Sequence, residues 1–308
     1  MEVRDLYKSY GRVSAVQGLS FDVNRGEVFG LLGPNGAGKS TTLSMLCGLF
    51  PPTSGDVLIA GHSVKEDPAR VKRLLGVVPQ EVALYPRLSG RSNLRFWGEM
   101  YGLGGAELSA RVDQVLDMVG LRERAGDPVV RYSGGMKRRL NFAVGLLPEA
   151  ELLILDEPTI GVDPQSRHRM FELIQDEKKR GTTVIYTTHY MEEAETLCDR
   201  VAIMDEGRLL AVGTVRELQR QALEHQEIDV TAMGVTCELV TRLQSAPVIS
   251  RVDVKDDVLK LITDEPEQAL ATAFRCFTEA GARVSKVEIH RPNLEGLFMK
   301  MTGKRLRD

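Results

Sequence analysis

A glycine-rich loop early in the chain has the residue types and the spacing of a phosphate-binding site. It matches the pattern G-x-x-x-x-G-K-[ST] at every fixed position. The glycines allow backbone N–H groups to turn toward phosphate oxygens, and the helix that follows adds the positive end of its dipole. We expect Lys39 to reach the β- and γ-phosphates of a nucleotide and the Ser40 hydroxyl to bind Mg²⁺. The loop consists of Gly33, Pro34, Asn35, Gly36, Ala37, Gly38, Lys39 and Ser40.

A pair of carboxylates farther along the chain indicates hydrolysis of the bound nucleotide. Residues 152–155 form a continuous apolar run, typical of a buried parallel strand, and the run ends in Asp156 and Glu157. Open α/β sheets bind ligands at this end of their strands. We expect Asp156 to hold magnesium through water and Glu157 to polarise an attacking water, a group that a nucleotide kinase would not need. The alternative is that the pair merely ends a strand before Pro158.

A histidine follows another predicted strand. Residues 184–186 are rich in β-formers, and His189 stands just beyond them, before an acidic segment suited to a helix. A lone histidine is usually structural. At the end of a parallel strand in a nucleotide-binding sheet, we instead expect His189 to sense the γ-phosphate.

The stretch from residue 131 to 140, RYSGGMKRRL, predicts a second anion-binding helix start. Ser133 is a good N-cap, and Gly134 and Gly135 leave the N–H groups of the first turn open. The basic residues 137–139 either support that site or form an ordinary solvated helix face, and for their side chains we favour the solvated face. Apolar residues recur on one face of this predicted helix at Met136, Leu140, Ala143, Val144 and Leu147.

The composition restricts the class of protein that carries these residues. A chain of 308 residues favours two domains. Its formal net charge of -3 argues against a dedicated nucleic-acid binder, so no nucleic-acid partner is expected. The first residues predict no signal peptide, and no apolar run approaches the roughly 20 residues of a membrane-spanning helix. The cysteines lack metal-type spacing and are expected to be idle thiols; they are Cys47, Cys198, Cys237 and Cys276.

A mostly helical segment separates the two halves of the nucleotide site. It covers residues from about 81 to 147 and contains the only tryptophan of the chain. We expect Phe96 and Trp97 to pack in the core of this segment. Tyr85, beside Pro86, is the better candidate for contact with a partner protein.

Taken together, these motifs resemble those of an ATP-binding cassette (ABC) ATPase, the nucleotide-binding subunit of an ABC transporter. The sequences GPNGAGKST, which extends the loop to Thr41, YSGGM, LLILDEP, GVDP and TTHY occur in the order of that family. The resemblance covers residues 1–220 and implies that Tyr10 stacks on adenine and that Gln80 joins magnesium to the transport partner. Met136 departs from the family, where many members have glutamine, and puts one side-chain contact in doubt.

The resemblance also implies an architecture and a mode of action. The fold would be an α/β cassette of the P-loop NTPase type with an inserted helical subdomain. Two cassettes would pack head to tail, so that Ser133, Gly134 and Gly135 of one close over the ATP and Mg²⁺ of the other, with Asp163 at their interface. We lean toward a homodimer with two identical sites; a different second cassette stays open. Transmembrane permease subunits would hold the protein peripherally at the cytoplasmic face of the membrane and would carry the cargo-binding site.

The remaining residues, 221–308, predict a small accessory domain. Their pattern is strand, helix, strand, strand, helix, strand, a ferredoxin-like α+β arrangement with no residue that suggests catalysis. The tail, residues 292–308, is similar to endings seen in the daunorubicin-resistance type of drug, antibiotic and polysaccharide exporters. That similarity favours export by a separate permease and a dimerising or regulatory role for this domain.

Two other functions are alternatives to export. A soluble ABC-type ATPase acting on ribosomes or nucleic acid would usually carry two cassettes or a long coiled-coil insertion, and this chain has neither pattern. A regulator that binds ATP without hydrolysing it is disfavoured because Glu157 and His189 fill both hydrolytic positions.

Overall fold

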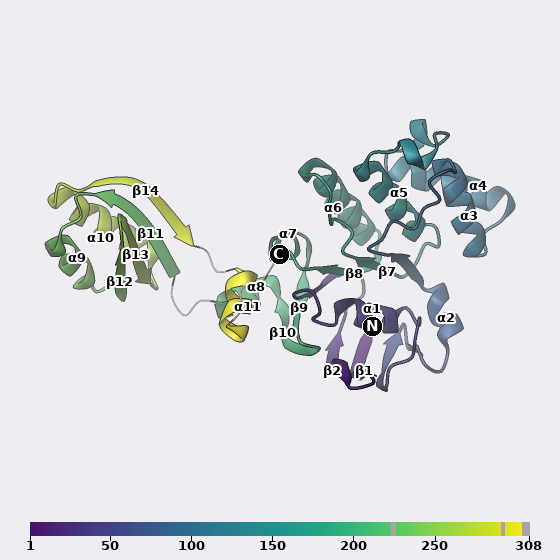
Figure 1. The fold of residues 1–308 in the computed structure, drawn as a ribbon, viewed down its shortest axis with the longest axis horizontal. Helices are drawn as coiled ribbons and strands as arrows, with labels where there is room; N and C mark the ends of the chain where they lie inside the picture. Colours follow the sequence, from purple (N-terminus) through teal and green to yellow (C-terminus); the bar gives the residue numbers. More distant parts are fainter. Residues whose placement is uncertain (223–225, 291–292, 304–308) are drawn as a thin grey trace. The chain divides into compact units, whose positions relative to one another are not determined.

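The structure is a computed structural model that describes residues 1–222, 226–290 and 293–303. Contacts between residues divide the chain into two compact units (Figure 1). The first is Met1–Val215, and the second begins at Arg216. The sequence-based boundary lay a few residues later, after residue 220. We describe each unit by itself.

A six-stranded sheet forms the centre of the first unit. Its strand order is β10-β9-β3-β8-β7-β6, and all neighbours pair in parallel except β10 and β9. Every residue of β3 and of β8 is buried, because other layers cover both faces of the sheet. The strands are β3 (Val28–Leu32), β6 (Leu75–Val78), β7 (Leu152–Asp156), β8 (Thr183–Thr188), β9 (Arg200–Asp205) and β10 (Arg208–Thr214).

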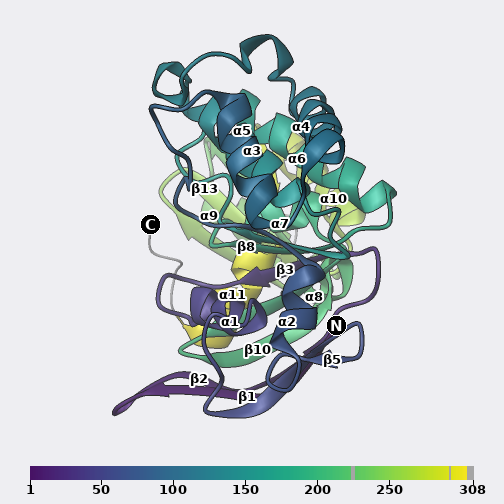
Figure 2. The same ribbon diagram turned by 90° about the vertical axis from the view of Figure 1, so that its right-hand side faces the viewer.

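A four-stranded antiparallel sheet lies on the other side of helix α1 (Lys39–Leu46). Buried residues of α1, including Leu43 and Leu46, share one core with strands of both sheets, and Figure 2 shows α1 between them. This packing fixes the start of α1 at the edge of the central sheet. The second sheet has the order β2-β1-β4-β5 and consists of β1 (Glu2–Tyr10), β2 (Val13–Asp22), β4 (Ser54–Ile59) and β5 (His62–Ser63); α2 (Pro68–Arg73) follows it.

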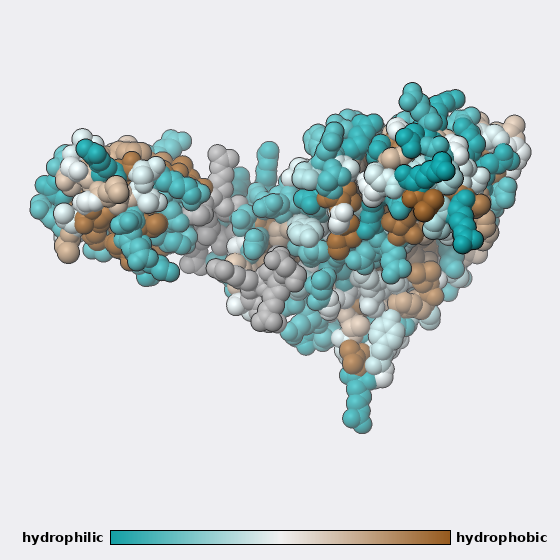
Figure 3. All heavy atoms as spheres, turned by 45° about the horizontal axis from the view of Figure 1, so that its top comes forward, coloured by the Kyte–Doolittle hydropathy of each residue, from teal (hydrophilic) through white to brown (hydrophobic). Residues whose placement is uncertain are grey.

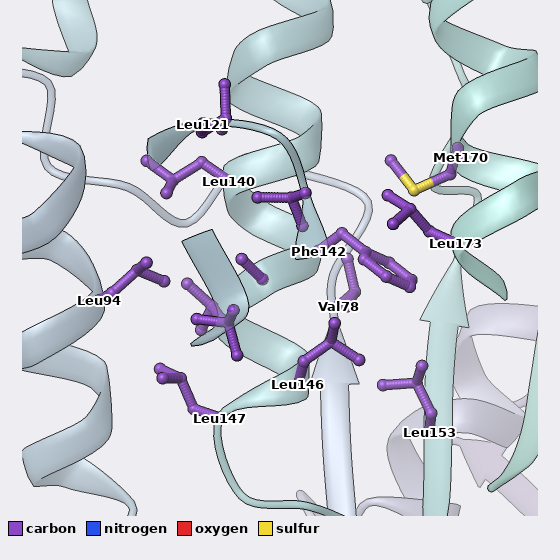
Figure 4. Close-up of a cluster of buried hydrophobic side chains, with 14 of the residues drawn as sticks. Val78, Leu94, Leu121, Leu140, Phe142, Leu146, Leu147, Leu153, Met170 and Leu173 are labelled. Carbon is purple, nitrogen blue, oxygen red and sulfur yellow. The ribbon is translucent and has the colours of Figure 1, made fainter. Parts of the chain in front are cut away.

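Helices cover the opposite face of the central sheet. Figure 4 shows Leu94 of α3, Leu140 of α5 and Met170 of α6 turned toward one core. Leu153 of strand β7 belongs to the same core. The expected apolar face of α5 is confirmed, since four of its five residues are buried and Met136 packs against them. The helices are α3 (Gly90–Met100), α4 (Gly105–Met118), α5 (Gly134–Leu146), α6 (Pro164–Lys179) and α7 (Met191–Leu197).

The expected core packing of the aromatic residues in the helical segment is confirmed for Trp97, whereas Phe96 is half-buried and contacts other aromatic rings. Trp97 packs against the core and donates from Nε1 to the Ala83 carbonyl at 3.0 Å. Phe96 contacts both Trp97 and Tyr85 edge to face, and Tyr85 itself is 46% exposed. The side chain of Asn93, fully buried, accepts from the Tyr85 backbone N–H at 2.7 Å. The loop that presents Tyr85 is therefore tied to α3.

The second unit contains a four-stranded sheet in which every neighbouring pair is antiparallel. Its strand order is β12-β13-β11-β14, and α9 and α10 share a core with it. Of the tail, residues 293–303 are described and contain α11 (Leu294–Thr302); the other tail residues lie outside the described part. The elements are α8 (Val215–Ala222), β11 (Gln226–Met233), α9 (Cys237–Gln244), β12 (Arg251–Lys255), β13 (Val258–Thr263), α10 (Pro266–Glu279) and β14 (Arg283–His290).

The surface is predominantly hydrophilic in the view of Figure 3, where hydrophobic residues gather only in small separate patches. Among the described residues, no helix combines the length and the apolar character that crossing a membrane requires.

Candidate nucleotide-hydrolysis site

The phosphate loop joins β3 to α1 as predicted, and close packing dictates its glycines. Gly38 caps α1 with a φ of +97°, a left-handed conformation that glycine adopts without strain. A Cβ atom at Gly38 would lie 2.6 Å from the Ala15 carbonyl oxygen, and one at Gly33 would lie 2.2 Å from that of Met204. A side chain at either position would push the loop off the sheet. Glycine is therefore required here for packing as well as for phosphate approach.

Three side chains from separate segments converge on the carboxylate of Glu157. Lys39 Nζ lies 3.4 Å from Glu157 Oε1. On the other oxygen, Gln80 Nε2 donates to Oε2 at 3.3 Å, and His189 Nδ1 lies 3.3 Å from it. These residues follow β3, β6 and β8, whose carboxyl ends meet at one edge of the parallel sheet. The structure thus brings together the predicted residues of four separate motifs.

Burial shapes the charge of Lys39. Its ammonium group donates to the carbonyl oxygens of Gly33 at 2.7 Å and Pro34 at 3.1 Å, and the residue is 4% exposed. Burial lowers the pKa of Lys39, while the nearby charges of Glu157 and Asp156 act in the opposite direction. The lysine is already desolvated and held in place, so an entering phosphate would meet a preformed positive charge.

Glu157 occupies a strained backbone position. Its φ is +43°, in the left-handed region that costs a residue with a side chain about 1–3 kcal/mol. Its backbone N–H donates to Thr187 Oγ1 at 3.0 Å, and Thr187 donates in turn to Asp156 Oδ1 at 2.7 Å. The hydrogen bond from the Glu157 N–H helps to hold this backbone conformation. In this conformation the Glu157 carboxylate lies beside Lys39.

The oxygen atoms beside this cluster suit a magnesium ion. Burial raises the pKa of Asp156, and hydrogen bonds from Thr187 and Ser40 oppose that rise. A hydroxyl, a carboxylate and the amide oxygen of Gln80 form the hard ligand set that Mg²⁺ prefers, with water completing its shell. His189 Nδ1 is buried without a hydrogen-bond partner, a sign that a polar group is expected beside it. The residues present fit a nucleotide with its magnesium.

The residues of the SGG motif do not join this cluster. Ser133 caps α5 by accepting from the Met136 backbone N–H at 3.2 Å, as expected. A Cβ atom at Gly134 would meet nothing within 4 Å, whereas one at Gly135 would lie 2.2 Å from Ser166 Oγ. Within the described residues, no hydrogen bond or ion pair links this helix start to Lys39 or Glu157.

Asp163 and Tyr10 lie in positions that differ from those of the central residues. Asp163 caps α6, its Oδ1 accepts from the Ser166 backbone N–H at 2.9 Å, and these hydrogen bonds lower the pKa of its carboxyl group. A Cβ atom at Gly135 would lie 3.6 Å from Asp163 Oδ2, so the start of α5 lies beside the start of α6. Tyr10, at the end of β1, is 50% exposed and rests edge-on against Phe50, with its ring centroid 6.1 Å away. Its ring is accessible to an adenine base.

Sequence reasoning missed two residues that tie α5 to the segments around the site. Arg138 donates to the Gln80 carbonyl, and its Nη2 donates to the Ile160 carbonyl at 3.1 Å. Asn141, 1% exposed, donates to the Pro79 carbonyl at 3.2 Å and accepts from the Ala83 N–H at 3.0 Å. A polar Asn141 within the apolar run of a predicted helix was the available signal.

The expected solvated face of residues 137–139 is wrong, because all three residues are partly buried. Arg138 and Arg139 are partly buried, and burial lowers the pKa of each guanidinium. Arg139 Nη1 donates to the Val119 carbonyl at 2.9 Å. Both side chains donate hydrogen bonds to main-chain carbonyls of neighbouring segments. No sequence pattern reveals such contacts.

A phosphate loop at the edge of a parallel sheet, with a carboxylate pair and a histidine beside it, defines a P-loop nucleoside triphosphatase of the cassette type. The comparisons agree. The family model described as ABC transporter matches residues 16–160. This chain belongs to the ABC transporter family and is an ABC-type ATPase.

Relatives and solved structures extend the similarity. The linearmycin resistance ATP-binding protein LnrL of Bacillus subtilis (strain 168) is 43% identical over 312 residues, covering 100% of each chain. The daunorubicin resistance ATP-binding protein DrrA3 of Streptomyces coeruleorubidus is 37% identical, covering 96% of this chain and 93% of that protein. A solved structure described as the ATP binding subunit of an ABC transporter is 34% identical, with a TM-score of 0.65, covering 71% of this chain and 92% of that one.

Proposed function

We propose that this protein binds Mg-ATP at the Glu157 cluster, dimerises head to tail and uses hydrolysis to drive export through separate permease subunits. The convergence of Lys39, Gln80 and His189 on one strained carboxylate supports the hydrolytic part most directly. His189 and Glu157, the proposed sensor and base, lie 3.3 Å apart, and this proximity supports hydrolysis over a regulator that only binds ATP.

In this proposal the γ-phosphate lies between Lys39 and Glu157. Lys39 neutralises phosphate charge, and Glu157 accepts a proton from the water that attacks phosphorus. His189, whose Nδ1 has no hydrogen-bond partner, contacts the γ-phosphate and Glu157. Ser40, Gln80 and Asp156 hold the magnesium, which supplies charge neutralisation on the phosphate oxygens when bound.

The open helix start of α5 supports a second cassette in the proposed complex. Ser133 caps the helix, Gly134 has open space around it, and among the described residues no hydrogen bond or ion pair joins this helix start to Lys39 or Glu157. A phosphate placed there would come from a nucleotide on another copy, with Asp163 at the same interface. A helix start contributes about 0.3–1 kcal/mol toward an anion, whereas a general base contributes about 10²- to 10⁴-fold in rate. The motif therefore acts mainly in closing the dimer.

Export is the activity that the relatives support, and their names give different cargoes: besides the two resistance proteins, a 38% identical relative from Ralstonia nicotianae is named Nod factor export ATP-binding protein I. LnrL and DrrA3 are both named for resistance, to linearmycin and to daunorubicin, and both align with nearly all of this chain. The permease would bind the cargo and hold the cassette peripherally at the cytoplasmic face of the membrane, with exposed Tyr85 on the docking surface. The soluble role on ribosomes or nucleic acid gains no support from these relatives.

We infer that residues 221–308, which make up most of the second unit, form a ferredoxin-like accessory domain. Its two strand-helix-strand repeats and its strand order β12-β13-β11-β14 support that fold. A dimerising or regulatory role would be consistent with a domain that carries no part of the Glu157 cluster.

Glu157→Gln tests the proposed base. The variant should bind ATP with wild-type affinity and hydrolyse it at least about a hundredfold more slowly, because the amide cannot accept the proton. Steady-state phosphate release and nucleotide binding measure the two properties, and wild-type turnover would refute the assignment of Glu157.

The same variant tests the dimer. Light scattering during size-exclusion chromatography should show a monomer without nucleotide and a dimer with Mg-ATP. Adding Gly134→Asp should prevent the dimer and leave ATP binding by each chain intact, since the carboxylate would face the γ-phosphate. A dimer that still forms with both substitutions would contradict the proposed role of this helix start.

A further inference from the structure

A buried carboxylate outside the nucleotide cluster lies next to the hydrolytic segments. Glu193 belongs to α7 and is only 3% exposed. Removing a carboxylate from water is costly unless hydrogen bonds and charge compensate for the lost solvation. The contacts of Glu193 show which parts of the protein provide that compensation.

Three hydroxyl groups contact this carboxylate. Tyr186 and Thr188 both donate to Oε2 at 2.8 Å. Thr159 Oγ1 lies 2.9 Å from Oε1 and 3.0 Å from Oε2. Arg167 Nε, buried and without a hydrogen-bond partner, lies 3.3 Å from Oε1 and supplies positive charge. Glu193 is therefore the common partner of side chains from one loop, one strand and one helix.

These partners belong to the segments that carry the proposed hydrolytic residues. Thr159 is two residues beyond Glu157, and Thr188 immediately precedes His189. Successive side chains of a strand point to opposite faces, so β8 uses both of its faces here. Thr187 holds the Glu157 backbone from one face, while Thr188 holds Glu193 from the other.

The backbone on the far side of His189 is held as well. The Tyr190 N–H donates to Thr188 Oγ1 at 3.0 Å, and the Glu193 N–H donates to the Tyr190 carbonyl at 3.2 Å. The Tyr190 ring lies 4.0 Å from the His189 ring, and the Arg167 guanidinium lies 5.8 Å from the Tyr190 ring. His189 thus sits in a turn whose two flanking residues are both linked to Glu193.

We propose that Glu193 is a positioning residue for ATP hydrolysis: its carboxylate fixes the turn of His189 and, through Thr159, the chain that follows Glu157. This inference rests on the hydrolytic roles proposed above for His189 and Glu157. Glu193 touches no reacting atom, so its removal should slow hydrolysis without weakening ATP binding. An ordinary core carboxylate would instead affect stability alone.

Glu193→Gln and Glu177→Gln form a matched pair for the test. Glu177 is also a buried glutamate, 8% exposed, but its contacts are Arg180 and Thr182 at the opposite end of β8. In the full-length chain, Glu193→Gln should lower kcat about tenfold, as is common for residues that orient a site from outside it. Its Kd for Mg-ATP should change less than twofold. Glu177→Gln should leave both quantities unchanged, and an equal loss of kcat in the two variants would overturn the proposal.

A double-mutant cycle separates positioning from a general structural effect. If Glu193 acts through His189, adding Glu193→Gln to His189→Ala should slow single-turnover hydrolysis less than about twofold further. A full additional tenfold loss would show that the two residues act independently, and would overturn the inference.

Thr188 provides a second test should Glu193→Gln fold poorly. Thr188→Val removes the hydroxyl at nearly constant volume and should reduce kcat, whereas Thr188→Ser keeps the hydroxyl and should restore it. Equal activity of the two variants would contradict the proposed network. His189→Ala and Glu157→Gln are measured alone in parallel: if neither slows hydrolysis, the proposed site has failed, whereas slow hydrolysis in both with normal Glu193→Gln turnover refutes this inference alone.

Discussion

At the scale of single residues, burial has opposite consequences for chemistry at different positions. Lys39 is buried but surrounded by carbonyl oxygens and carboxylates, so its charge is retained for a phosphate. Cys47, close behind the same loop, is buried among apolar residues with no compensating positive charge. Burial raises the pKa of the Cys47 thiol to about 12. Burial thus leaves the Lys39 ammonium group available for a phosphate, whereas it makes the Cys47 thiol unreactive.

Thiol reactivity should follow this difference. At pH 8 and a pKa of about 12, about one Cys47 thiol in ten thousand is ionised. Burial also raises the pKa of Cys198, whereas Cys237 is exposed. A disulfide reagent should therefore label Cys237 rapidly and reach Cys47 and Cys198 only after denaturation, as mass spectrometry of labelled peptides can show. Rapid labelling of Cys47 in the folded protein would contradict its described environment.

The same shift predicts a direction for stability at alkaline pH. Because the folded-state pKa of Cys47 lies above its usual value of 9.0, folding favours the protonated thiol. Its contribution to stability is complete below about pH 9 and is lost as pH rises toward about 12. Cys47→Ser should reduce this pH dependence in urea-unfolding measurements over that range, and an unchanged slope would argue against it.

At the scale of elements, helix α5 links the SGG motif to the rest of the site. Its first turn is open at Gly134 and closed at Gly135, while Arg138 and Asn141 hold the segment around Gln80. These contacts join the helix that carries the SGG motif directly to the Gln80 segment. The position of α5 therefore depends on hydrogen bonds that lie outside its apolar face.

The two glycines of α5 should differ sharply in their tolerance of a methyl group. At Gly135 a Cβ atom would lie 2.2 Å from Ser166 Oγ and 2.9 Å from Ser166 Cβ, so α5 and α6 would have to separate. Gly135→Ala should lower the free energy of unfolding by about 1–3 kcal/mol, the usual cost of overpacking. Gly134→Ala, with open space around it, should not lower that free energy. Urea unfolding of both variants checks the difference, and equal values would refute the described packing.

At the scale of the whole molecule, the chain has separate cores with different tasks. The cores that surround the central sheet belong to Met1–Val215, which contains every residue proposed to bind the nucleotide. The core of the second unit consists of residues from 228 onward. Damage to the second core should therefore leave the chemistry of the first unit intact.

Two leucine substitutions test this separation. Leu261 and Leu153 are both buried, the former in the second unit and the latter in β7 of the first. Each change to alanine should cost about 2–5 kcal/mol in its own unit. Calorimetry should show that they shift different transitions, and only Leu153→Ala should impair ATP hydrolysis. A comparable loss of ATPase activity in Leu261→Ala would show that the second unit supports the catalytic one.

The sequence by itself determined the elements and most of the site, because fixed local patterns encode them. The glycines and Lys39 of the phosphate loop, the apolar run before Asp156 and the Ser133 cap depend on neighbours within a few residues. Arg138, Asn141 and Glu193 hold these parts together, and the contacts that they make could not be predicted. Their partners include carbonyls and a hydroxyl distant in sequence, so only the tertiary structure could bring donor and acceptor together. Hydrogen bonds between distant segments produce no recognisable pattern in a sequence, whereas a phosphate loop has a fixed motif and a buried strand has an apolar run.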